Sequence, residues 1–237
     1  MIALPYACVF FDFDGVVVDS VDAKIKAFGE LYAPFGDDVR RAVEEYQRAV
    51  PGETRFEKIP RFHRELLGEE LSAEETQIWC NRLSDIVLEQ IVACPLLPDV
   101  IDVLSLLARR GIAAHVVSGT PQDELCIIAE RKGLAPFFES LRGAPERKAP
   151  IVRDILSSSG FKAADCLFIG DAMTDYNAAR ETGTAFLGCA PDGTGPFPEG
   201  TIVVKRLQAA FFPKNTMRAP TDRKSNPEGS GLKAVNA

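Results

Sequence analysis

The first apolar run of the chain, residues 6–11, is continuous and does not alternate with polar positions. A short run of this kind, rich in residues that favour β-structure, is typical of a strand buried on both faces of a parallel sheet. Acidic residues follow immediately, in the segment Asp12-Phe-Asp14-Gly15. The pattern therefore predicts a central strand whose carboxyl end leads into an acidic loop.

Apolar residues recur at spacings of three and four over residues 21–93, which is the helical period. Within this stretch Ser72-x-x-Glu75 forms a capping box, a signal for the start of a helix. Pro60 interrupts the third helical stretch, near residues 55–67. The pattern predicts an all-helical unit, for which we expect the boundaries 20–94.

From residue 95 onward the pattern changes to an alternation of helices and short apolar strands, which predicts an α/β fold with a parallel sheet and helices on both of its faces. The core is expected to comprise residues 1–19 and 95–212, so that the helical unit is an insertion. Residues 213–237 are polar, contain Pro and Gly and lack an apolar period, which favours a disordered tail. The expected strands are 113–117, 166–169, 185–187 and 202–204, and the expected helices are 100–110, 122–132, 149–158 and 174–181.

Composition narrows the classes of partner. The 237 residues carry a formal net charge of -7, which argues against broad binding to nucleic acid or to anionic membranes. No apolar run approaches the roughly 18 to 20 residues of a membrane-spanning helix, and the N-terminus has no basic region of a signal peptide. We expect a cytoplasmic protein, a monomer or a homodimer, that acts on a small molecule.

Cysteine and histidine usage limits the chemistry. The six cysteines lie far apart and form no C-x-x-C pair, and only His63 and His115 are available as imidazoles. Histidine-rich metal sites are therefore excluded. Any metal must be held mainly by oxygen ligands.

Two pairs of carboxylates follow predicted strands. Asp12 and Asp14, at i and i+2, can project to the same side, and Asp171 and Asp175 are four residues apart at the start of a helix. Crowded carboxylates need a cation or a shared proton, and oxygen ligands suit Mg²⁺. The alternatives are an Asp-Gly turn for the first pair and helix capping for the second, above all for Asp175.

Two further loops carry groups that suit an anion. Ser118-Gly119 ends the strand expected at 113–117 and offers a hydroxyl and backbone N–H groups ahead of a helix. Lys148 lies in a loop before another helix and can reach a phosphate. The alternatives are a helix N-cap for Ser118 and a solvated charge for Lys148.

Taken together and in this order, these segments resemble the four motifs of the haloacid dehalogenase-like (HAD) superfamily over about residues 6–205. The resemblance implies a Rossmann-like core. The long gap between the first two motifs resembles the branch of phosphoglycolate phosphatase-like enzymes and β-phosphoglucomutase, in which a helical cap is inserted after the first strand. The motifs are Asp12-Phe-Asp14-Gly15, Ser118-Gly119, Lys148 and Gly170-Asp171-x-x-x-Asp175.

The resemblance implies a Mg²⁺-dependent phosphatase acting on a small phosphorylated metabolite. Asp12 would form an aspartyl phosphate, and Asp14 would act as general acid and then as general base. Ser118, the Gly119 N–H and Lys148 would bind the phosphoryl oxygens. The resemblance assigns the metal to Asp12, the backbone carbonyl of Asp14, Asp171 and Asp175, the last directly or through water.

Two alternatives remain at this point. A β-phosphoglucomutase-like phosphosugar mutase is one, although such mutases carry a histidine where Lys24 stands here. A catalytically silent binding protein that kept the fold is the other. The carboxylate at Asp14 sets aside 2-haloacid dehalogenases and phosphonoacetaldehyde hydrolases, which lack it in the family pattern.

Substrate choice is expected to depend on the helical unit. Gly52-x-x-Arg55 resembles a cap loop by which some relatives contact substrate, and it makes Arg55 a candidate for binding a second carboxylate or phosphate. The alternative is a surface Arg55 in an i,i+4 ion pair.

Overall fold

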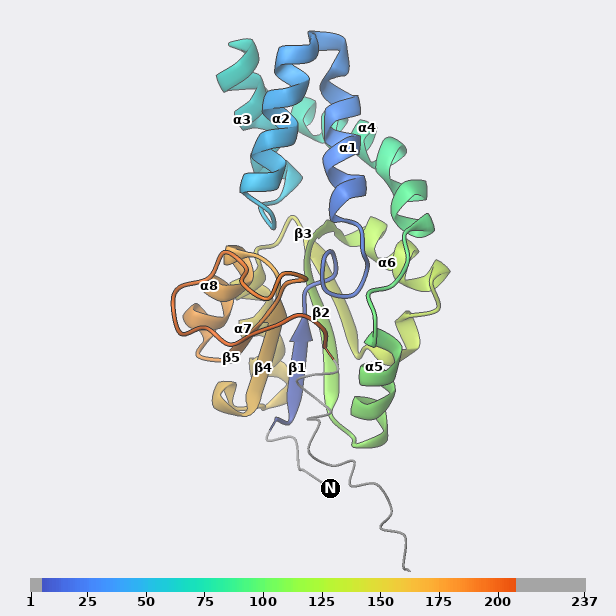
Figure 1. Cartoon of the computed structure of the whole chain (residues 1–237), viewed down its shortest axis with the longest axis vertical. Helices are drawn as coiled ribbons and strands as arrows, with labels where there is room; N and C mark the ends of the chain where they lie inside the picture. The colour runs from blue at the N-terminus through green and yellow to red at the C-terminus, as the bar shows by residue number, and fades with distance from the viewer. Residues whose placement is uncertain (1–5, 208–237) are drawn as a thin grey trace, which may run out of the picture.

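The computed structural model of the chain describes residues 6–207, and its centre is a six-stranded sheet with the order β3-β2-β1-β4-β5-β6 (Figure 1). All neighbouring strands run parallel. The strands are β1 (Cys8–Phe11), β2 (Ala113–Pro121), β3 (Ser140–Ala144), β4 (Cys166–Gly170), β5 (Ala185–Cys189) and β6 (Val203–Val204).

The register of β1 explains where the acidic loops lie. Phe10 is paired with His115 of β2 on one side and with Phe168 of β4 on the other. Because the three strands are parallel and in step, their carboxyl ends meet at one edge of the sheet. The loops that follow β1 and β4, and the last turn of β2, are therefore neighbours in space.

Alternate residues of the strands pack on opposite faces, as the period of two requires. Phe11 and Ile169 belong to the apolar core that α5 (Val100–Arg109) and α6 (Gln122–Arg131) cover. Phe10 and Phe168 face the second apolar core, beneath α7 (Lys148–Ser159) and α8 (Met173–Thr182). Figure 1 shows these two helix pairs on either side of the sheet. The predicted α/β fold is confirmed.

The part of the chain between β1 and α5 forms a separate helical unit above the carboxyl ends of the strands (Figure 1). Its α4 begins with the predicted capping box, in which Ser72 Oγ accepts the Glu75 N–H at 3.2 Å. Pro60 lies inside a helix, and the hydrogen-bond pattern changes to a π-helical turn only at His63. The helices are α1 (Val21–Tyr32), α2 (Asp37–Ala49), α3 (Arg55–Phe62) and α4 (Ala73–Ala93), with short helices η1 (Ala33–Phe35) and η2 (His63–Leu67).

The chain enters and leaves the helical unit through two segments that lie side by side. Val18 and Leu96 form an antiparallel bridge, and the Leu97 N–H donates to the Val17 carbonyl at 3.0 Å. The Asp19 N–H donates to the Pro95 carbonyl at 3.0 Å. These hydrogen bonds define a paired junction at the boundaries expected from the sequence, 20–94, whose status as a separate domain stays a prediction.

Five of the six strands follow the sequence pattern and one, β3, does not. The pattern predicts no strand at Ser140–Ala144, because this edge strand is only partly buried and carries no apolar run. Two further short helices, η3 (Ala135–Phe137) and η4 (Ala163–Asp165), complete the core. The tail for which disorder is expected, residues 213–237, lies outside the described residues. Residues 208–212, at the end of the expected core, also lie outside them.

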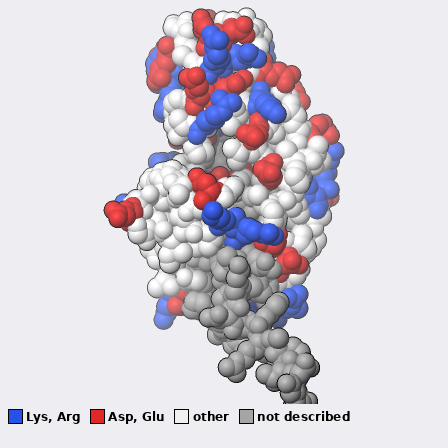
Figure 2. Space-filling model, viewed as in Figure 1, with Lys and Arg blue, Asp and Glu red and all other residues white. Residues whose placement is uncertain are grey.

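Charges of both signs are interspersed on the face seen in Figure 2, most densely over the helical unit at its top. Within residues 6–207, no helix combines the length and the apolar character needed to cross a membrane.

Candidate active site

The loop after β1 carries the first acidic pair into the space between the sheet and the helical unit. Asp12 is 4% exposed, and its Oδ1 accepts the Phe13 N–H at 2.7 Å. Gly15 has a φ of 76°, which lets the loop turn back, and a Cβ there would lie 2.1 Å from Asp171 Oδ2. This glycine is needed both for the turn and for the close approach of the second acidic loop.

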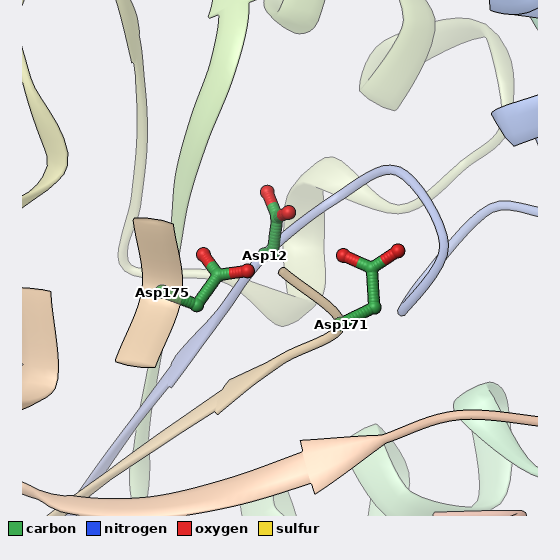
Figure 3. Close-up of side chains that lie close together, drawn as sticks. All are labelled: Asp12, Asp171 and Asp175. Atoms are coloured by element: carbon green, nitrogen blue, oxygen red, sulfur yellow. The ribbon is translucent and has the colours of Figure 1, made fainter. Parts of the chain in front are cut away.

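Three carboxylates converge on a common space at the edge of the sheet (Figure 3). Asp12 follows β1, Asp171 follows β4, and Asp175 lies in the first turn of α8. One oxygen of each lies within 4.8 Å of the others. We predicted from the sequence that these three carboxylates lie close together, and the structure brings them together.

Burial and the neighbouring carboxylates raise the pKa values of Asp12 and Asp171 in this acidic cluster. Burial and the Asp175 carboxylate raise the pKa of Asp12 to about 7, against the opposing effect of Lys148. Burial, with Asp12 and Asp175 nearby, also raises the pKa of Asp171 well above its usual range. Carboxylates that repel one another in this way, with hard oxygen donors only, fit a small divalent metal ion.

Lys148 supplies positive charge to the cluster. Its Nζ lies 3.0 Å from Asp12 Oδ2 and 2.6 Å from Asp175 Oδ1. Burial would lower the pKa of Lys148, but the carboxylates of Asp12 and Asp175 outweigh it and raise the pKa. The residue begins α7 and is only 7% exposed, so the solvated-charge alternative for Lys148 is wrong.

Asp175 combines two roles. Its Oδ2 accepts the Ala172 N–H at 3.0 Å, which caps the start of α8, while its Oδ1 accepts from Lys148. The helix-capping alternative is therefore correct for one oxygen of this residue. Its assignment as a metal ligand stays a prediction.

Asp14 is not one of the three carboxylates of the acidic cluster and has hydrogen-bond partners of its own. Its carboxylate accepts from Ser20 Oγ at 2.6 Å, from Thr120 Oγ1 at 2.7 Å and from the Lys24 ammonium. Burial alone would raise the pKa of Asp14, but Lys24 and the two hydroxyls outweigh it and hold the pKa below its usual value. Asp14 is thus a fixed carboxylate whose orientation is set from both sides.

Ser118 and Gly119 lie near the end of β2, beside the cluster. Ser118 is fully buried, and its Oγ accepts the Thr120 N–H at 3.1 Å. Gly119 and Lys148 line the same pocket above the carboxyl ends of the strands. The predicted anion-binding role of these two residues stays a prediction.

The larger setting is a pocket between the core and the helical unit, which we call the inner pocket. The core contributes Asp12, Asp14, Gly119, Lys148 and Asp171. The helical unit contributes polar residues, chiefly Lys24, Gln47, Arg55 and Lys58, and an apolar wall of Val21, Ile25, Phe28, Leu83 and Val87.

Arg55 is buried, which excludes the surface alternative. Its guanidinium donates to Glu124 Oε1 of α6 at 2.9 Å and to Ser84 Oγ of α4 at 2.7 Å. Glu124 Oε2 accepts from Ser84 in turn, at 2.7 Å. The charge of Arg55 is therefore matched by a core carboxylate, and its contact with substrate stays a prediction.

The sequence reasoning did not place several residues at the site, among them Lys24, Lys58, Thr120 and Glu124. One signal was available, because Arg55 and Lys58 are three residues apart and share a face of α3. The α3 start is fixed by a second capping box, in which Glu57 accepts from Thr54 N at 3.2 Å. The Glu124 contact spans 69 residues, and no local pattern predicts it.

Comparison with known proteins places the chain among hydrolases. The sequence model of the haloacid dehalogenase-like hydrolase family matches residues 6–183. The chain is 23% identical over 180 residues to phosphoglycolate phosphatase 1 of Pseudomonas aeruginosa, covering 74% of this chain and 66% of that protein. It is 28% identical over 180 residues to phosphoglycolate phosphatase of Synechococcus elongatus, covering 74% and 79%.

A solved structure shares the fold. The crystal structure of a predicted phosphoglycolate phosphatase from Haemophilus somnus superposes with a TM-score of 0.70 at 17% identity, covering 88% of this chain and 97% of that one. The likeness extends over both the sheet and the helical unit of the described chain.

Proposed function

This chain belongs to the haloacid dehalogenase-like hydrolase family, and we propose that it is a Mg²⁺-dependent phosphatase that hydrolyses a small phosphate monoester through an aspartyl phosphate on Asp12. The observation that carries the proposal is the pairing of Asp12 with Lys148 at the edge of the acidic cluster. The phosphatase relatives in two bacteria support the substrate class.

The residues fit a metal ion. Asp12, Asp171 and Asp175 would hold it, together with the backbone carbonyl of Asp14. When bound, Mg²⁺ offsets the repulsion between the carboxylates and the phosphate dianion. Lys148 also offsets this repulsion, because its ammonium contacts the carboxylates of Asp12 and Asp175.

In the first step a carboxylate oxygen of Asp12 attacks phosphorus, and the bond between phosphorus and the ester oxygen breaks. Asp14, in the fraction of the enzyme in which it is protonated, gives that proton to the departing oxygen, so that an alcohol leaves. Lys148, the Ser118 hydroxyl and the Gly119 N–H bind the phosphoryl oxygens during the transfer. Asp14 lines the inner pocket, so the alcohol part of the substrate lies there.

In the second step Asp14 takes a proton from water, which attacks phosphorus and releases phosphate from Asp12. This step requires Asp14 as a carboxylate, and Lys24, Ser20 and Thr120 favour that form. A carboxylate held ready for water favours rapid hydrolysis of the aspartyl phosphate. This supports a phosphatase over a mutase, which must keep its phosphoenzyme from water.

We also propose that residues 20–94 form a cap domain that covers the substrate. The support is the position of the inner pocket between this unit and the core, and the paired junction through which the chain passes. The walls contributed by α1, α3 and α4 would enclose the alcohol part of the substrate.

The test is phosphate release from a panel of sugar phosphates, phosphoglycolate, nucleotides and other small phosphoesters, with Mg²⁺ or EDTA. We expect release by the wild type with Mg²⁺, none with EDTA, and a loss of at least about 10³-fold in Asp12→Asn. The matched control is Asp102→Asn, on the exposed surface of α5, which should keep full activity.

Two results would contradict the proposal. Release of phosphate by Asp12→Asn at the wild-type rate would exclude Asp12 as the nucleophile. Isomerisation of a hexose 1-phosphate that depends on a sugar bisphosphate, without net phosphate release, would replace the phosphatase by a mutase.

A further inference from the structure

Four cationic side chains line the inner pocket, and three of them are matched by carboxylates. Lys24 contacts Asp14, and Lys148 contacts Asp12 and Asp175. Arg55 is paired with Glu124. The fourth cation is Lys58, for which the described part of the chain provides no carboxylate contact.

Lys58 is 3% exposed, and its ammonium donates to the side-chain carbonyl of Gln47. The ammonium also lies 5.9 Å from the centre of the Phe28 ring. Both partners are neutral. A buried ammonium with neutral partners alone is unfavourable, and burial lowers the pKa of Lys58 to about 8.

The nearby carboxylates are engaged elsewhere. Glu53 Oε2 accepts from Tyr46 at 2.9 Å, and its Oε1 accepts from Arg61 at 3.0 Å. Glu57 accepts from Thr54 in the capping box of α3. The positive charge of Lys58 is therefore left for a ligand of the inner pocket.

The same pocket contains Asp14, which faces the departing alcohol in the proposed reaction. We propose that Lys58 is a specificity-determining residue that binds a second anionic group, a carboxylate or a phosphate, on the alcohol part of the phosphate monoester. The inference rests on the proposed phosphatase function and names its substrate class.

The apolar lining of the pocket bears on the middle of the substrate. Phe28, Leu83 and Val87 line the same pocket as Lys58 and Asp14, and the centre of the Phe28 ring lies 5.9 Å from the Lys58 ammonium. An alkyl segment between the ester oxygen and the second anion would contact them. A substrate rich in hydroxyl groups would leave those groups without partners along this wall.

The test uses ω-phosphonooxy carboxylates of increasing chain length, beginning with phosphoglycolate, each compared with its neutral amide. We expect the wild type to prefer the carboxylate, and Lys58→Met to lower the ratio of kcat/KM for carboxylate over amide by about 10- to 100-fold, mainly through KM. Lys58→Arg should recover most of the ratio. Lys26→Met, an exposed lysine of α1, is the matched control and should keep the wild-type ratio.

A second variant tests the idea without removing the lysine. Gln47→Glu is nearly isosteric and gives Lys58 a carboxylate partner inside the protein. We expect the carboxylate-to-amide ratio to fall in this variant as well. A ratio that stays at the wild-type value in both Gln47→Glu and Lys58→Met overturns the inference.

The outcomes separate the two proposals and the two anions. Hydrolysis of amides and carboxylates with equal kcat/KM by the wild type overturns the role of Lys58 and leaves the phosphatase proposal standing. No hydrolysis of any ester overturns both. The bisphosphates of matching alkanediols form a parallel series, and a larger effect of Lys58→Met on that series than on the carboxylates identifies phosphate as the preferred second anion.

Discussion

The floor and the roof of the inner pocket treat charge differently. On the floor, formed by the loops of the core, Lys148 and the acidic cluster are held together by direct contacts. On the roof, formed by the helical unit, Arg55 is matched by Glu124 of the core while Lys58 has only neutral partners. The charged groups of the floor contact one another directly, whereas Lys58 on the roof retains a positive charge that a ligand can match.

This difference separates two tasks. In the proposed reaction, the groups that make and break bonds need fixed positions, and they lie on loops anchored by the sheet. In the proposed substrate selection, the group that binds the second anion needs an unmatched charge, and Lys58 provides one on a helix outside the sheet. Four changes test this division, in order of decreasing effect.

Replacement of Lys148 by methionine should have the largest effect. The variant removes the ammonium shared by Asp12 and Asp175, so kcat/KM for any ester should fall by about 10³-fold. Its melting temperature should also fall, and Mg²⁺ should raise it more than in the wild type, because a cation then replaces the lost charge. Steady-state kinetics and thermal melting with Mg²⁺ or EDTA measure both effects.

Lys162→Met, an exposed lysine of the core, is the control and should change neither quantity. An active Lys148→Met enzyme would mean that the floor does not depend on its lysine.

Replacement of Glu124 by glutamine tests the ion pair between α6 of the core and Arg55 of the helical unit. Arg55 would keep a buried charge without a full counter-charge, so the free energy of unfolding should fall by about 3 kcal/mol. The double variant Arg55→Met with Glu124→Gln removes the unmatched charge and should be more stable than Glu124→Gln alone. Denaturant unfolding measures the three variants.

Glu130→Gln, on the exposed side of α6, is the matched control. If the double variant is no more stable than Glu124→Gln, the ion pair is not what stabilises this contact.

Replacement of Lys24 by methionine should have a smaller effect, confined to the departing oxygen. Lys24 fixes Asp14 together with Thr120, and its loss should lower kcat for alkyl phosphates by about tenfold. p-Nitrophenyl phosphate should be less affected, because p-nitrophenolate departs without a proton. Equal losses for both esters would show that Lys24 does not act through Asp14.

The pH dependence of selectivity should show the smallest effect. Burial holds the pKa of Lys58 at about 8; Lys24 and Arg61 also lower it, and Glu53 and Glu57 act against them. A lysine is charged below its pKa, so the carboxylate-to-amide ratio of kcat/KM should fall by about fourfold between about pH 7 and about pH 8.5. Lys58→Arg should show no fall over this range, because arginine stays charged. A wild-type ratio that is constant with pH would contradict the assignment.

The sequence alone predicted the fold better than it predicted the contacts of the site. Continuous apolar runs identified β1 and β4, and the motif loops followed because parallel strands in register end at one edge. The edge strand β3 was missed because its sequence, SLRGA, carries no apolar period. Periodicity reports burial, and an edge strand is only half buried.

The site residues that were missed depend on contacts distant in sequence. Glu124 meets Arg55 only because α6 of the core packs beside the helical unit. Lys58 and Arg55 lie on the same face of α3. Only the contact with Glu124 shows that Arg55 has a carboxylate partner and Lys58 does not, in the described part of the chain. The sequence pointed to α3 as the helix for substrate choice, and the ion pair of Arg55 with Glu124 moves our proposal from Arg55 to Lys58.

The paired junction at Val18 and Leu96 also bears on how such a protein can diversify. The chain enters and leaves the helical unit at neighbouring points, so removal of the unit would require only a short turn to reconnect the core. Exchange of this unit would leave the six-strand register and the acidic cluster in place. Reaction and selectivity can therefore be inherited separately. A chimaera in which residues 20–94 are replaced by the corresponding helical unit of a relative should acquire that relative's substrate preference and keep the loops of this core.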